Sequence, residues 1–176
     1  MRNFVIAAVA ILAFAGFVTS GQAHSKARAM TEAEPFAQEL KSSGQFEIES
    51  SKLALARTKN EEIKKFAQKM IDDHTAADEK LSETLKQANL PAPKHGMDHK
   101  TRELFDELTA LHGANFERAY VRDQIKGHEE VVALLEAYSK KGDNDALKQL
   151  ASTLLPTIKE HLQMAEGLRS SATARR

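Results

Sequence analysis

The sequence predicts an all-α protein: a ferritin-like antiparallel bundle of four long helices, with an extra short helix between the second and the third. Three observations lead to this prediction. Apolar residues recur with the three-then-four spacing of a helix that buries one face, and no useful length of strand-like alternation occurs. Most joints between the helical segments are short, and short joints favour antiparallel neighbours.

Capping signatures and breakers set the expected ends of the helices. Thr31 to Glu34 fit a capping box, and Thr58 to Glu61 repeat the signature before the second helix. The proline-rich loop Pro91 to Gly96 stops the second helix, and Asn144 caps the last one. Pro156 should kink or break the last helix. The expected helices, in chain order, are residues 35–57, 60–89, 98–111, 114–140 and 145–168, so that the bundle covers residues 35–169.

The first 23 residues have the pattern of a secretory signal peptide. Arg2 is followed by an apolar run from Phe4 to Val18, and small residues lead up to a cleavage site after Ala23; a second site after Ala29 is an alternative. We therefore expect an exported, periplasmic protein with a linker at residues 24–34 and a disordered tail at 170–176. No second run is long enough for a transmembrane segment.

Composition excludes several classes of site. The chain has no cysteine, so disulfides, thiolate ligands and cysteine nucleophiles are ruled out. Basic and acidic residues number 25 each, which gives no reason to expect nucleic acid as a partner. No nucleophile elbow, phosphate loop or hydrolytic triad is visible, and no catalytic residue is assigned. An envelope protein or a second copy of the chain is the kind of partner that remains.

Three histidines occupy positions where the apolar stripes call for an aliphatic residue. His74, His128 and His161 each follow an isoleucine by three residues, and each lies on a different helix. Glu47 lies midway along the apolar face of the first helix, whereas Glu49 points outward. Because the midpoints of antiparallel helices lie at similar heights, these four side chains can meet in one layer of the core.

Imidazoles and a carboxylate are suitable ligands for a transition metal, and we predict one ion of zinc, copper, iron or manganese bound by Glu47, His74, His128 and His161. Asp78, Gln124 and Thr157 are the polar residues expected to orient the ligands. Asp72-Asp73 is interpreted as a solvated helix face.

Two alternatives stay open. The layer can instead be free of metal, with Glu47 accepting hydrogen bonds from the imidazoles and fixing helix register in a structural or protein-interaction module of the envelope. Phe46 and Leu53, on the flank of the first helix, would then contact a partner. A redox enzyme is the third possibility and needs an open coordination position.

Several phrases of the chain resemble an exported bacterial family of unknown function, DUF4142, whose members are often labelled outer-membrane proteins. The phrases are Phe46-Glu47-Ile48, Ile63 to Ala67, Asp73-His74, Phe116 to Tyr120, His128 and Leu154-Leu155-Pro156 with His161. The resemblance spans about residues 35 to 168 and implies a ferritin-like fold and export rather than an activity. From the metal site we expect a role in metal handling or envelope stress.

The chain departs from diiron ferritin-like proteins, which carry Glu-x-x-His on two helices. Here Ile71, Ile125 and Ile158 stand three residues before the histidines, so carboxylates to bridge two irons are lacking. The sequence therefore supports a mononuclear site.

Overall fold

The computed structural model describes residues 31–174, with side chains up to residue 169, and it confirms the all-α prediction. The predicted signal peptide, residues 1–23, lies outside the described residues, as do most of the predicted linker and the last residues of the tail. The helices are α2 (Ala33–Arg57), α3 (Glu61–Gln87), α4 (His99–Thr109), α5 (Gly113–Lys141) and α6 (Asp145–Ala174).

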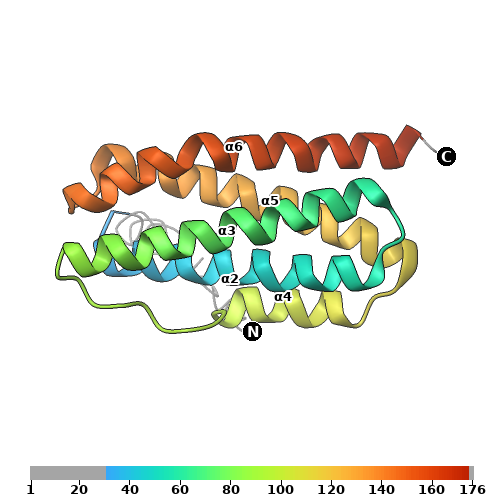
Figure 1. Ribbon diagram of the computed structural model, residues 1–176, viewed down its shortest axis with the longest axis horizontal. Helices are drawn as coiled ribbons and strands as arrows, with labels where there is room; N and C mark the ends of the chain where they lie inside the picture. The colour runs from blue at the N-terminus through green and yellow to red at the C-terminus, as the bar shows by residue number, and fades with distance from the viewer. Residues whose placement is uncertain (1–30, 175–176) are drawn as a thin grey trace, which may run out of the picture.

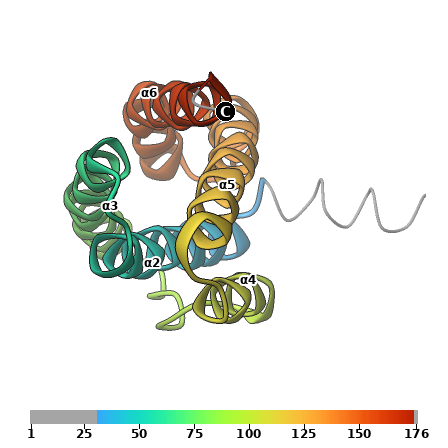
Figure 2. The same ribbon diagram turned by 90° about the vertical axis from the view of Figure 1, so that its right-hand side faces the viewer.

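Four long helices form the bundle as two antiparallel hairpins, α2 with α3 and α5 with α6 (Figure 1). Viewed end-on, α3 lies beside α6 and α2 beside α5, so each long helix has an antiparallel neighbour on either side (Figure 2). The connection from α3 to α5 returns along the length of the bundle, and α4 packs on the outside against α2 and α5. One long crossover of this kind is typical of ferritin-like bundles.

The helix ends differ from the prediction in three places. The capping box predicted at Thr31 is wrong, because α2 begins at Ala33 with Glu32 in the cap position and no side-chain cap. Asn60, rather than Thr58, caps α3 by accepting a hydrogen bond from the backbone N–H of Glu62. At the other end, α6 continues through Pro156 without a break and reaches Ala174, beyond the predicted end of the bundle.

The core consists of two apolar clusters, one toward each end of the bundle. The first includes Phe36, Leu81, Leu135, Tyr138 and Leu147, from the amino-terminal halves of α2 and α6 and the carboxyl-terminal halves of α3 and α5. The second fills the opposite end with aromatic residues, among them Phe46, Phe66, Phe116 and Tyr120. Polar residues occupy the layer between the two clusters, and this layer contains the predicted site.

Two further sequence-based expectations concern the surface. Phe46 is only 4% exposed and packs in the second cluster, so it is not available to a partner protein. Within residues 31–174, no helix combines the length and the apolar character needed to cross a bilayer.

Gly142 ends α5 directly beside a stacked aromatic pair. The ring of Tyr138 lies 3.8 Å from that of Phe36, and the Tyr138 hydroxyl donates a hydrogen bond to Asp143. A β-carbon on Gly142 would lie 2.4 Å from Cε1 of Tyr138 and 2.7 Å from its carbonyl oxygen. The pair therefore depends on a residue without a side chain at this position.

We predict that Gly142→Ala lowers the free energy of unfolding by about 1–3 kcal/mol, because the stack must move to admit the methyl group. Urea unfolding measures the change. Gly167→Ala is the control, since Gly167 is exposed inside α6 with no atom within 4 Å of an added β-carbon; it should stabilise by about 0.5–1 kcal/mol. Equal effects of the two substitutions would contradict the prediction.

Candidate metal centre

Three histidines from three helices meet in the polar layer between the two apolar clusters. His74 of α3, His128 of α5 and His161 of α6 are 6%, 1% and 0% exposed. Their ring centroids lie 5.4–5.6 Å apart, and one nitrogen from each ring lies within 4.8 Å of the other two. The structure thus brings together the three histidines that the sequence singled out.

His128 is oriented by its own helix. Its Nδ1 lies 2.8 Å from the backbone carbonyl oxygen of Gln124, one turn earlier in α5. A carbonyl oxygen only accepts, so Nδ1 carries the proton and Nε2 keeps its lone pair. Burial lowers the pKa of His128 to about 4, although the hydrogen bond to Gln124 acts in the opposite direction. The ring is therefore neutral at pH 7, with Nε2 free to bind a cation.

His161 is oriented from a different helix, by a carboxylate of α3. Its Nε2 lies 2.7 Å from Oδ2 of Asp73, and Lys69 holds the same oxygen at 3.0 Å. Desolvation would raise the pKa of Asp73, but the hydrogen bonds from His161 and Lys69 outweigh it and lower that pKa, so Asp73 is an ionised acceptor. Nε2 of His161 must then donate, which leaves the lone pair on Nδ1.

Each of the three rings has one buried nitrogen without a hydrogen-bond partner among the described residues: Nε2 of His74, Nε2 of His128 and Nδ1 of His161. Burial lowers the pKa of His161, and it lowers that of His74 well below the ordinary value, where the neighbouring imidazoles add to the effect. Neutral rings with converging lone pairs form a set of donors that suits a metal ion.

Glu47, the fourth predicted ligand, lies in the same layer but not among the three nitrogens. It is 3% exposed, and its Oε1 is 3.8 Å from Nδ1 of His128, the nitrogen that faces Gln124. Gly127 leaves room for this carboxyl, since a β-carbon there would lie 3.1 Å from Oε1. Burial raises the pKa of Glu47 to about 8, with a smaller contribution from the charge of Asp123. As a ligand, Glu47 stays a prediction.

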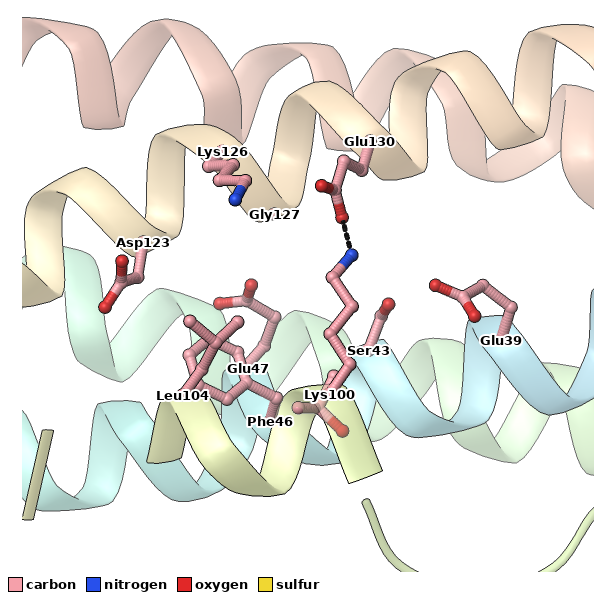
Figure 3. Close-up of a pocket in the computed structure, with 11 residues that line it drawn as sticks. Glu39, Ser43, Phe46, Glu47, Lys100, Leu104, Asp123, Lys126, Gly127 and Glu130 are labelled. Carbon is pink, nitrogen blue, oxygen red and sulfur yellow. Dashed lines mark hydrogen bonds and ion pairs between the residues drawn. The ribbon is translucent and has the colours of Figure 1, made fainter. Parts of the chain in front are cut away.

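Glu47 also faces a separate cavity of about 30 Å³ on the α2–α5 side of the bundle (Figure 3). Asp123, Lys126 and Gly127 of α5 line this cavity, and an ion pair between Lys100 and Glu130 crosses its other end. The Glu47 carboxyl group thus lies 3.8 Å from His128 and also borders this cavity.

The orienting residues are only partly those predicted. Gln124 acts through its backbone carbonyl, while its side chain donates to Ser50. Asp78 instead forms an ion pair with Lys41 at 2.6 Å, and Thr157 lines a cavity beside His161. The interpretation of Asp73 as part of a solvated face is wrong. Its i, i+4 pair with Lys69 was visible in the sequence, but its contact with His161 depends on how α3 and α6 pack.

The family model of DUF4142, described as a domain of unknown function, matches residues 18–168 of the chain. No curated protein matches the sequence.

Solved structures of CopM, in forms with bound copper or silver, share the fold. CopM in its Cu(II)-bound form is 19% identical with a TM-score of 0.64, and the match covers 79% of this chain and 97% of CopM. The Ag-bound form is 18% identical with a TM-score of 0.63, covering 80% of this chain and 96% of CopM. The Cu(I)-bound form gives 18% identity and a TM-score of 0.64, covering 78% of this chain and 95% of CopM. At this level of identity, the likeness shows a common fold.

We predict that the metal-free protein loses stability as the pH falls from about 6.5 to about 4. In that window the unfolded chain takes up a proton on His128 while the folded ring stays neutral, so the unfolding free energy falls by up to about 1.4 kcal/mol per pH unit for this ring. The lowered pKa values of His74 and His161 act in the same direction. The raised pKa of Glu47 has the opposite effect on stability: between about pH 4.5 and 8, the folded protein gains stability from this group as the pH falls. Glu47 is, however, a single group.

Urea unfolding of chelator-treated protein at a series of pH values measures this dependence. His128→Leu removes one of the buried rings and should make the slope between pH 6.5 and 4 shallower by up to one proton. An unchanged slope in that variant would mean that His128 does not titrate as its burial requires.

Proposed function

The chain belongs to the DUF4142 family, and we propose that it is an exported protein that binds one transition-metal ion in its core through His74, His128 and His161. Two observations on the same three buried rings carry this proposal: each ring offers a ligand nitrogen within 4.8 Å of the other two, and each has a buried nitrogen without a hydrogen-bond partner among the described residues. Leaving such groups without partners in an apolar core is costly, and one metal ion satisfies all three at once.

The geometry requires only a small adjustment. Ligand nitrogens are about 3.4 Å apart in a tetrahedral complex with bonds of about 2.1 Å. The three nitrogens here lie within 4.8 Å of one another, so modest ring movements bring them to bonding distance. For Glu47 we propose a supporting role, because its carboxyl lies beside Nδ1 of His128 rather than among the three nitrogens.

Copper is the ion that we propose first among zinc, copper, iron and manganese. Imidazole nitrogen suits copper and zinc, and copper(II) is bound most tightly of the divalent first-row ions at a given site. The shared fold with CopM, a protein solved with Cu(I), Cu(II) and Ag, also supports the choice of copper.

We propose that the protein works in the periplasm, in metal handling and, as a consequence, in resistance to envelope stress. The signal-peptide pattern of residues 1–23 supports export. The rival proposal, a metal-free module in which the histidine layer fixes register, requires the inner nitrogens to be satisfied by ordered water instead.

We predict about one metal ion per chain in protein exported to the periplasm and purified without chelator or affinity nickel. The double variant His74→Ala/His128→Ala should bind none, since it removes two of three ligands. Elemental analysis gives the stoichiometry, and thermal unfolding should show stabilisation of about 2.7 kcal/mol at a free copper concentration 100 times Kd in the wild type alone.

His99→Ala is the matched control for metal binding, because His99 is on the surface with its side chain 89% exposed. It should retain the metal. If the wild type contains no metal and gains no stability from copper, zinc, iron or manganese, the metal proposal fails and the structural alternative stands.

We predict that Asp73→Ala weakens metal affinity by about 10- to 100-fold, because His161 loses the acceptor that fixes its tautomer. Competition with a chromophoric chelator measures the affinity. The neighbouring Asp72→Ala is the control: Asp72 is exposed and accepts a hydrogen bond only from Gln68 in the same helix. Equal affinities of the two variants would remove Asp73 from the site.

A further inference from the structure

A cavity of about 110 Å³ lies between α3 and α6, beside the histidine cluster. His74 and His161 form its inner wall, and the exposed residues Ala76 and Lys80 form part of its outer wall. Because buried ligands and exposed residues line one space, this cavity connects the cluster with the surface of the bundle. The α3–α6 side of the bundle lies opposite to the α2–α5 side (Figure 2), where Glu47 lines its separate cavity together with residues of α4 and α5.

A second cavity, of about 20 Å³, adjoins the first and is also lined by residues of α2 and α5. Both cavities are lined by His74, Ala77, Leu154 and Ile158. A space of this volume holds about one water molecule. His74 therefore has space for a small molecule on two sides.

Three histidines leave one position of a tetrahedral metal unfilled. Metal sites with three protein ligands keep the fourth position for a small exchangeable molecule, whereas structural sites fill it with a fourth side chain. The side chain predicted for that position, Glu47, lies on the Nδ1 side of His128. The open space lies on the side of His74 and His161 instead.

We propose that the metal bound by the three histidines has an exogenous fourth ligand, a water molecule or a small anion, which enters through the cavity between α3 and α6. This inference rests on the proposed metal site. Thr157 adds a hydroxyl group to the cavity wall, and Lys80 adds a positive charge at its outer edge. Asp73 also lines the cavity, where it is paired with Lys69 at 3.0 Å and bonded to His161. The positive charges that would attract a small anion are those of Lys80 and of the proposed metal ion.

The test uses Co²⁺ as a spectroscopic metal and sodium azide as the small anion. Chelator-treated protein is loaded with Co²⁺, its stoichiometry is measured, and azide is added while the visible d–d absorption is recorded. The expected result is one Co²⁺ per chain and a saturable change of the spectrum with azide, because the anion enters the coordination sphere.

Two variants tie this response to the cavity. Ala77→Leu fills the space shared by the two cavities and should raise the azide midpoint at least about tenfold while Co²⁺ still binds. Lys80→Met removes an exposed charge, does not endanger folding, and should raise the midpoint about two- to fivefold. Lys86→Met, an exposed residue of the same helix outside the cavity lining, should leave it unchanged.

The outcomes separate this inference from the proposed function. Stoichiometric Co²⁺ with no azide response in the wild type overturns the open position and leaves the metal site intact. A response that appears only in Glu47→Gln also overturns it, since Glu47 would then be the fourth ligand. If Co²⁺ does not bind at all, the proposed function itself has failed. An azide response that is equal in the wild type and both cavity variants overturns the assigned route.

Discussion

The cost of burying three imidazole rings among apolar side chains is the constraint on which this structure depends. A polar group that leaves water without gaining a partner destabilises the folded state by about 1–3 kcal/mol. Every long helix except α2 contributes one such ring to the layer, and α2 contributes Glu47. A protein whose only requirement was a stable bundle would have leucine at these positions. The proposed metal ion would satisfy all three rings at once, which accounts for their presence.

Hydrogen bonds on the outer side of two rings fix the tautomer and the orientation of each ring. The carbonyl of Gln124 fixes His128 from within α5, and the carboxylate of Asp73 fixes His161 from across the α3–α6 interface. Both partners are acceptors, so both rings present a lone pair to the centre. Apolar clusters on either side exclude water along the bundle axis and hold the helices in the register that brings the rings together.

Much of this arrangement follows from the sequence, because it depends on periodicity. His74, His128 and His161 interrupt apolar stripes near comparable heights, and antiparallel packing brings such positions together without further information. The burial of Glu47 follows from the same argument. Its position beside the outer nitrogen of His128 does not, since it depends on side-chain direction and on the space at Gly127.

The contact of Asp73 with His161 was likewise beyond a sequence argument, because the two residues are far apart in the chain and their helices are not joined by a hairpin. Local spacing only showed Asp73 on a polar helix face. The sequence does not reveal the cavities for the same reason: the space beside His74 is set by how all four long helices pack, and small residues such as Ala77 are common in any helix.

Pro156 gives the helix that carries His161 a local mechanical property. A proline has no N–H, so α6 lacks one backbone hydrogen bond about one turn before His161, while the helix still continues. This turn lies between Leu154 and Ile158, two core residues that also border both cavities. The missing hydrogen bond makes this turn easier to bend than the rest of α6, so a small bend here would move Nδ1 of His161 toward the proposed metal ion while the ends of the bundle stay fixed.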